Sequence, residues 1–253
     1  MFFPVFGVWA LGLYQLKTMM KDDMKGWRDK VFVVMLAFGA SVFAAAPVSA
    51  KLVSEGLFGS REIPSKNMKS FDKWTEMWRR HNLPRKEEDP DAVPVKGPPC
   101  RGLARIQCGR DAWNAFIESH SDSEGVDLLS AVNDYMNKSP YIVDPVNWGI
   151  PDYWATPDEF FLKDGDCEDY AISKYITLKR LGLPADNMRL VILQDENLRV
   201  AHAVLSVELD GETYILDNQI DSVLPHTQIL HYRPVYSINE GGWWLHQVKR
   251  FSR

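Results

Sequence analysis

The sequence predicts an α+β fold in which a helical N-terminal part precedes one further helix and an antiparallel sheet. Three observations lead to this prediction. Apolar residues recur at helical spacing before residue 140, a turn-and-cap sequence (Asp164-Gly165-Asp166) opens a helix at Cys167, and strand patterns follow it as far as Asp217. Helices followed by strands, without regular alternation of the two, are typical of this class.

The composition is that of a globular protein. The chain has 253 residues, of which 45% are hydrophobic and 25% charged, so it suits one large domain or a domain with an added lobe. The formal charge of −5 gives no basic surplus, and we expect no nucleic-acid partner. Three cysteines are too few for a disulfide framework.

Residues 1–50 form a separate N-terminal region. A short, mostly basic stretch begins at Met24, a charge-free apolar run covers residues 31–46, and the small residues Val48-Ser49-Ala50 follow. This order is typical of an export signal. We therefore expect translation to start at Met24, residues 1–23 to be an upstream extension, and cleavage to follow Ala50. An uncleaved anchor and a genuine second hydrophobic segment are the alternatives.

Residues 51–109 are predicted to hold one helix and a linker. Phe71, Trp74 and Trp78 fall at helical spacing after Ser70, which could cap the helix, and we expect the aromatic residues to be core. Five prolines between residues 84 and 99 exclude a regular helix or central strand there. Export would permit Cys100 and Cys108 to form a disulfide, which would leave Cys167 as the odd thiol.

Residues 110–253 are predicted to form the main domain. Helical patterns cover 111–119 and 126–137, an ordered loop covers 141–156, and a helix covers 167–181 before the stop signals Gly182 and Pro184. Strand patterns cover 189–194, 199–209 and 212–217.

Cys167 is a candidate nucleophile because it begins a helix. Unpaired amide groups and the helix dipole stabilise a thiolate at such a position, and an imidazolium partner would lower the pKa of the thiol further. The alternative is a small buried hydrophobic residue, the common fate of a lone cysteine. The acidic neighbours of Cys167 are unfavourable for a thiolate and require an explanation.

The last two predicted strands bring a histidine beside an acid. The two-residue turn Asp210-Gly211 would pair Leu209 with Glu212, and the resulting register puts His202 and Asp217 on one face as diagonal neighbours. A shift of one residue would put them on opposite faces. Asp217 could then orient His202, and His202 could exchange protons with Cys167. Taken singly, each could instead be structural.

Three segments around these residues resemble the bacterial transglutaminase-like cysteine proteases of the LapG type. The similarity covers roughly residues 110–246. The segments that carry it are Asp164-Gly165-Asp166-Cys167-Glu168-Asp169-Tyr170-Ala171, Ala201-His202-Ala203-Val204-Leu205 and Leu216-Asp217-Asn218, supported by Trp148-Gly149, the run 152–159 and the run 234–239.

The resemblance implies a papain- or transglutaminase-like fold with the nucleophile helix packed on an antiparallel sheet. It implies a periplasmic, calcium-dependent endopeptidase that cuts a large surface adhesin near its N-terminus and so disperses biofilm. It also implies a partner, the periplasmic domain of an inner-membrane cyclic-di-GMP receptor. Carried over by motif, Cys167 would be the nucleophile, His202 the base and Asp217 the orienting acid.

The resemblance further implies that the acids beside Cys167 hold the calcium. Asp164, Asp166, Glu168 and Asp169 place four carboxylates within six residues, and calcium prefers six to eight oxygen ligands. Acids that complement the start of a helix are the ordinary alternative.

Two other functions fit the same residues. A transglutaminase or amidase would pass the acyl group to an amine, using the same triad. A non-catalytic module would use its cleft to hold a peptide.

Overall fold

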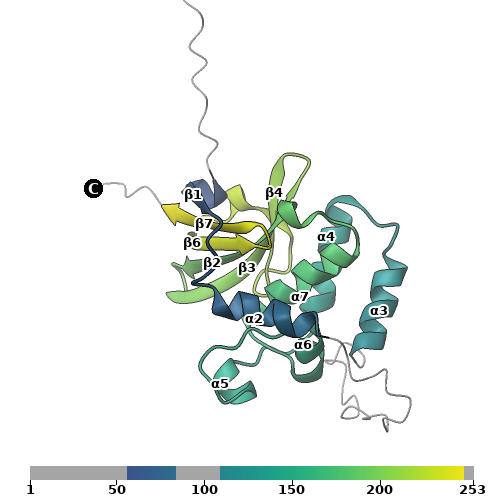
Figure 1. The fold of residues 1–253 in the computed structure, drawn as a ribbon. Coiled ribbons are helices and arrows are strands. Elements are labelled where there is room, and N and C mark those ends of the chain that lie inside the picture. The colour runs from purple at the N-terminus through teal and green to yellow at the C-terminus, as the bar shows by residue number, and fades with distance from the viewer. Residues whose placement is uncertain (1–55, 84–108, 248–253) are drawn as a thin grey trace, which may run out of the picture. The chain divides into compact units, whose positions relative to one another are not determined.

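The computed structural model describes residues 56–83 and 109–247, which belong to one compact unit, Leu52–Arg253. The predicted export signal, the Pro-rich stretch 84–99 and the Cys100/Cys108 pair lie outside the described residues. Within them the chain has the predicted α+β architecture, in which the α-helices come before all strands of the sheet except the first (Figure 1).

The described helices are α2 (Asp72–His81), α3 (Arg110–Ser119), α4 (Gly125–Met136), α5 (Asp144–Asn147), α6 (Pro157–Lys163) and α7 (Cys167–Arg180). The four predicted helices, α2, α3, α4 and α7, lie where their apolar patterns predict, within two or three residues, whereas α5 lies in the stretch 141–156 that was expected to be a loop and α6 was not predicted. The structure also has 3₁₀ turns η1 (Leu57–Gly59), η3 (Ala185–Asn187) and η4 (His226–Gln228).

Every strand pair in the sheet is antiparallel. The strands are β1 (Arg61–Ser65), β2 (Met188–Asp195), β3 (Val200–Leu209), β4 (Glu212–Leu216), β5 (Leu224–Pro225), β6 (Tyr232–Asn239) and β7 (Gly242–Gln247). Their order across the sheet is β1-β7-β6-β2-β3-β4-β5. The three predicted strands are β2, β3 and β4, and β2 and β3 occupy the inner part of the sheet.

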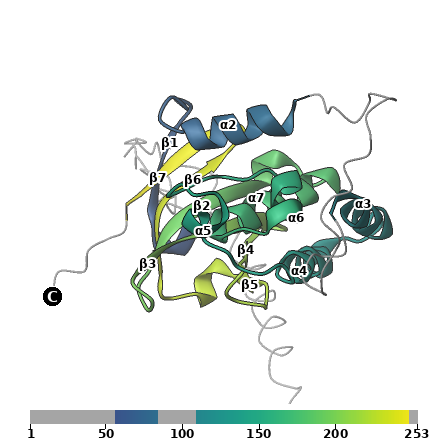
Figure 2. The same ribbon diagram turned by 90° about the horizontal axis from the view of Figure 1, so that it is seen from below.

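The predicted nucleophile helix is the central element of the main core. Helix α7 packs across β2 and β3, and α4 and α6 pack on its outer side (Figures 1 and 2). It is therefore buried almost all round from Asp169 to Leu178. Trp74 and Met77 of α2 close the same cluster, and the ring of Trp74 meets that of Tyr175 edge-on. Of the aromatic residues predicted to be core, Trp74 is buried, and Phe71 and Trp78 are partly buried against the cluster.

The other face of the sheet carries a smaller cluster. Val204 of β3 and Ile215 of β4 contribute to it, together with Tyr232 of β6 and Leu57 of η1. Their neighbours Leu205 and Leu216 face the helices. Because side chains alternate along a strand, His202 and Asp217 project to the same side as Val204 and Ile215.

Two helix starts differ from the sequence interpretation. Ser70 does not cap α2: the helix begins at Asp72, and the preceding Phe71 makes no side-chain capping bond. Helix α6 follows a capping box in which Thr156 and Glu159 bond each other's backbone N–H groups. A Thr-x-x-Glu sequence is a known start signal, so α6 could have been predicted.

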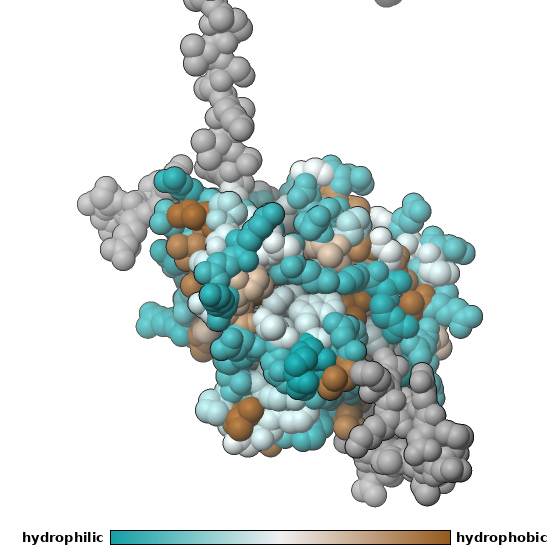
Figure 3. Space-filling view, in the orientation of Figure 1, coloured by the Kyte–Doolittle hydropathy of each residue, from teal (hydrophilic) through white to brown (hydrophobic). Residues whose placement is uncertain are grey.

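Among the described residues, no helix is long and apolar enough to cross a membrane. On the face shown in Figure 3, apolar residues are scattered in small groups among hydrophilic ones, including near α5. The exposed apolar side chains of that region belong to Tyr141, Val143, Val146 and Ile150.

A buried lysine in α7 makes folding depend on pH. Lys174 has no exposed surface, its Nζ has no hydrogen-bond partner among the described residues, and it lies 5.8 Å from the Tyr170 ring centroid. Burial lowers the pKa of Lys174 to about 7, against the nearby charges of Asp217 and Asp134, which favour the ammonium form. From pH 7 towards 10.5 the unfolded chain therefore binds a proton that the folded chain does not.

We predict that Lys174→Met abolishes this pH dependence. The unfolding free energy of the wild type should rise with pH relative to that of the variant, by about 2 kcal/mol between pH 7 and 9. Denaturant titrations of both proteins at both pH values measure their unfolding free energies. The contributions of the other titrating groups cancel in the difference between the two proteins, because both proteins contain them. The exposed Lys138→Met provides the control, with a constant difference from wild type; a constant difference for Lys174→Met as well would contradict the assignment.

Candidate active site

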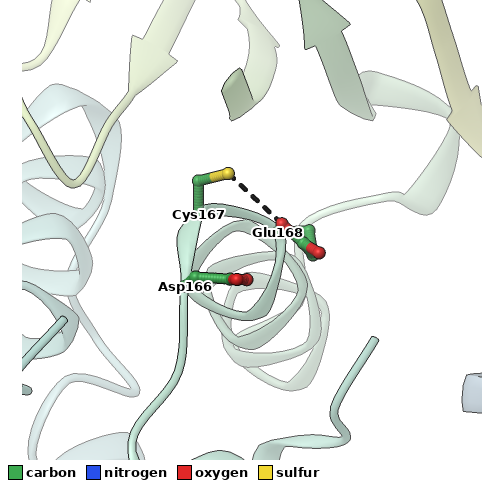
Figure 4. Close-up of side chains that lie close together, drawn as sticks. All are labelled: Asp166, Cys167 and Glu168. Carbon is green, nitrogen blue, oxygen red and sulfur yellow. Dashed lines mark hydrogen bonds between the residues drawn. The ribbon is translucent and has the colours of Figure 1, made fainter. Parts of the chain in front are cut away.

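Cys167 is the first residue of α7, and local hydrogen bonds hold that end of the helix in place. Asp166 precedes it in extended conformation, and the Asp169 carboxylate accepts the backbone N–H of Asp166 at 3.3 Å. The other oxygen of Asp169 accepts the N–H of Ala155 at 2.7 Å. Figure 4 shows the Cys167 side chain pointing out from the helix end, with Asp166 and Glu168 beside it.

The hairpin between β3 and β4 has the predicted register. Asp210 and Gly211 both have positive φ, 53° and 81°, as the favoured two-residue hairpin turn requires. Leu209 pairs with Glu212, and the ladder runs to Leu205 opposite Leu216. His202 Nε2 consequently lies 2.8 Å from Asp217 Oδ1, and both side chains are almost fully buried.

The same register leaves one backbone group of β3 free for the thiol. In a two-residue hairpin every second residue exchanges hydrogen bonds with the partner strand, which here means 209, 207 and 205. The N–H of Ala203 is next in that series, but β4 has ended at Leu216. The sulfur of Cys167 takes the place of an acceptor on β4 and accepts the hydrogen bond from the N–H of Ala203. Cys167 therefore meets β3 at the residue beside His202.

Two further side chains position the histidine and the acid. The phenol of Tyr232 donates to Asp217 Oδ2 at 2.6 Å, and the N–H of Gln219 donates to Asp217 Oδ1 at 2.9 Å. The side-chain amide of Gln219 lies 3.3 Å from His202 Nδ1. Burial alone would raise the pKa of Asp217, but these bonds and the one from His202 lower it below its ordinary value. Asp217 is thus an anion at neutral pH.

The thiol itself differs from the expected state. Its hydrogen donates to Glu168 Oε2 at 3.2 Å, and no hydrogen bond joins it to His202 in the part of the chain that the structure describes. Burial and the charge of Glu168 raise the pKa of Cys167, only partly offset by the bond from Ala203. The structure therefore differs from the expectation that the helix start lowers this pKa, because burial and the adjacent carboxylates outweigh the helix dipole.

A cluster of acids surrounds the start of α7. Possible ligand atoms lie within 4.8 Å of one another in three groups. These groups are Asp166, Cys167 and Glu168; Asp144, Asp152 and Glu168; and Asp144, Asp166 and Asp169.

The predicted metal ligands fall into different places. Asp166 and Glu168 lie at the centre of the cluster. Asp169 belongs to it too, but both of its oxygens already accept backbone N–H groups. Asp164 belongs to none of the three groups; it ends α6 with a φ of 64°, and its carbonyl accepts the Asn147 amide at 3.1 Å.

Asp144 and Asp152 were missed from the sequence because they come from another segment. The isolated bridge between Tyr141 and Gly165 ties the loop before α5 to the start of α7, and Asp144 N–H donates to Asp166 Oδ2 at 3.3 Å. Asp152 also forms an ion pair with Lys73 of α2. The sequence feature that could have identified them as possible ligands is the presence of acids in the Pro- and Trp-rich stretch 141–156.

The clustered carboxylates disfavour one another's charge. Burial raises the pKa of Glu168 to about 8, with the charge of Asp166 adding to the effect. Burial likewise raises the pKa of Asp144 to about 6, against the N–H bond from Tyr153, and Asp166 and Asp152 raise it further. Both carboxyl groups therefore lose their protons at a higher pH than ordinary Asp and Glu side chains do.

Known proteins resemble this chain at the level of a family and of solved structures. No match is found among curated proteins. Among solved structures, LapG of Legionella pneumophila is 38% identical over 53% of this chain and 76% of its own, with a TM-score of 0.48. A calcium-bound structure of the Legionella LapG is 36% identical over 56% of this chain and 82% of its own, also with a TM-score of 0.48.

A putative cysteine protease from Cytophaga hutchinsonii is 15% identical over 63% of this chain and 61% of its own, with a TM-score of 0.33. The model of one protein family matches residues 104–246, more than half of the chain and the whole of the site described above. The chain belongs to the bacterial transglutaminase-like cysteine proteinases, and it is a cysteine protease.

Proposed function

We propose that the chain is a calcium-dependent cysteine endopeptidase of the periplasm that cuts a large surface adhesin near its N-terminus. One observation carries the catalytic part of this proposal, the register of the β3–β4 hairpin. This register lets His202 form a hydrogen bond with Asp217, and it leaves the Ala203 N–H free to donate to the sulfur of Cys167. Cys167 would be the nucleophile, His202 the base and Asp217 the residue that orients it.

The roles of the two histidine nitrogens follow from their partners. Nε2 is occupied by Asp217, so Nδ1 is the nitrogen left to exchange a proton with the thiol. A shift of Cys167 Sγ from Glu168 towards Nδ1 would form the thiolate–imidazolium pair, displacing the amide of Gln219. The thiolate would attack the peptide carbonyl, and the imidazolium would then protonate the leaving amine. Water would hydrolyse the resulting thioester.

The acid cluster fits calcium in its donor chemistry. Hard carboxylate oxygens are the ligands that calcium prefers, and the cluster holds them from two segments of the chain. Asp144 Oδ1 and Asp166 Oδ1 are buried without a hydrogen-bond partner among the described residues, which is unusual for such atoms. We propose Asp144, Asp152, Asp166 and Glu168 as the side-chain ligands.

When bound, calcium supplies a positive charge that offsets the negative charges of these carboxylates. Glu168 engaged as a ligand would no longer accept the thiol hydrogen, and its charge would no longer oppose ionisation of Cys167. The release of Cys167 would make the shift towards His202 favourable. Calcium dependence of the protease would follow from the placement of Glu168 next to the nucleophile.

Export, substrate and partner belong to the same proposal. The signal-like residues 24–50 support a periplasmic location. The LapG-type resemblance supports a surface adhesin as substrate, and with it a role in biofilm dispersal. It also supports sequestration by the periplasmic domain of an inner-membrane cyclic-di-GMP receptor.

We predict that the protease cuts the N-terminal region of a surface adhesin of the same cell at one position, which gives two fragments. Cys167→Ala and His202→Ala should lower the cleavage rate at least about a thousandfold, because neither residue can be replaced within the triad. Gel analysis measures the cleavage rate, and mass spectrometry of the fragments identifies the cleavage position. His120→Ala is the control and should cleave like the wild type, since His120 follows the last residue of α3 and its ring contacts Phe116 of that helix.

Cleavage that persists in Cys167→Ala would refute the assignment of the nucleophile. Replacement of water by a labelled amine as the main acyl acceptor would instead support the transglutaminase alternative.

We predict that calorimetry detects one calcium site and that Asp166→Ala and Asp144→Asn weaken it at least about tenfold, because each removes a buried ligand charge. Calcium should also raise the melting temperature of the wild type. Asp127→Asn is the matched control, since Asp127 is another acid in the first turn of a helix, exposed and outside the cluster.

Cleavage that is insensitive to a chelator, or calcium binding that survives both substitutions, would contradict the metal assignment without touching that of the triad.

A further inference from the structure

Tyr232 donates its phenol to Asp217 and also packs against His202, with 5.8 Å between the centroids of the two rings. We propose that Tyr232 is a positioning residue for catalysis, which fixes the Asp217 carboxylate so that Oδ1 stays aligned with His202 Nε2. The inference rests on the proposed function of the triad and extends it by one residue. Tyr232 belongs to β6, whereas Asp217 follows β4, so no sequence motif around the triad contains it.

The hydrogen bonds divide the two oxygens of the carboxylate between different partners. Oδ1 accepts from His202 Nε2 at 2.8 Å and from the Gln219 N–H at 2.9 Å, while Oδ2 accepts from the Tyr232 phenol at 2.6 Å. A carboxylate held only at Oδ1 could rotate about its Cβ–Cγ bond. The phenol prevents this rotation because it holds the second oxygen.

Tyr232 keeps the proton that this role requires. Burial, together with the charge of Asp217, raises the pKa of the phenol, so it remains a donor throughout the working range. The charged and titrating groups around the pair are His202, Lys174 and Asp195, with Cys167 acting on Tyr232 from α7. Among these, the phenol is the partner of Oδ2 in the described part of the chain.

The ring of Tyr232 is itself held from behind. Phe58 of η1 meets it edge-on with 5.8 Å between ring centroids, and the backbone N–H of Phe58 donates to His226 Nδ1 at 3.0 Å. Phe58 has left-handed backbone angles, φ 52° and ψ 37°, which a non-glycine residue adopts only at a cost. Unfavourable geometry of this kind persists where the surroundings require it, and here it places an aromatic ring against Tyr232.

The test compares Tyr232→Phe with Tyr175→Phe in the calcium-loaded full chain. Both substitutions remove a phenol that donates to a carboxylate, since Tyr175 donates to Glu240 at 3.2 Å, at a distance from the triad. We expect Tyr232→Phe to lower kcat for cleavage of the adhesin N-terminal region about tenfold, with KM unchanged within about twofold. Tyr175→Phe should leave both constants unchanged.

A spectroscopic readout needs neither substrate nor turnover. The Nε2 proton of His202 should give a downfield proton NMR signal, identified by its loss in His202→Ala. In Tyr232→Phe that signal should shift and broaden as the carboxylate gains freedom, while in Tyr175→Phe it should match the wild type.

Failure of this inference is distinguishable from failure of the proposed function. If His202→Ala cleaves like the wild type, the triad is refuted and Tyr232 has no catalytic role. If His202→Ala is inactive while Tyr232→Phe matches Tyr175→Phe in kcat and leaves the signal unchanged, the phenol is merely structural and only the present inference is overturned.

Discussion

The register of the β3–β4 hairpin is the constraint on which the site depends. Two successive residues with positive φ, Asp210 and Gly211, fix which residues face each other, and a shift of one position would reverse every side chain. One register therefore has two consequences at once. It puts His202 against Asp217, and it leaves the Ala203 N–H unpaired where α7 presents its first side chain.

The electrostatics of the α7 start oppose the chemistry that its position favours. A helix N-terminus stabilises a thiolate by a few tenths to about 1 kcal/mol, but burial of the sulfur and the charges of Glu168 and Asp166 act in the other direction. The two effects are reconciled if the acids serve a cation and not the helix. Under the proposed function, Glu168 would hold the thiol when calcium is absent and release it to the triad when calcium binds, so the residue next to the nucleophile would make activity depend on the metal.

The sequence predicted those parts of the molecule that local physics determines. Helix α7, the β3–β4 turn and the His202–Asp217 pairing each follow from residues close together in the chain, and the structure has all three. Strand β1 pairs with β7, from which it is separated by most of the sequence, and no local pattern reveals such a distant partner. Asp144 and Tyr232 were missed for the same reason: each meets the site through tertiary packing, Asp144 from a loop and Tyr232 from β6.

The most direct test of the triad is the rate at which iodoacetamide alkylates Cys167 at neutral pH in calcium, with the labelled cysteine identified by mass spectrometry. If His202 accepts the thiol proton, the wild type should react at least about tenfold faster than His202→Ala, whose rate should fall to that of an ordinary cysteine. His120→Ala should react like the wild type. Equal rates for the wild type and His202→Ala would show that the imidazole does not activate the sulfur, and would contradict the account.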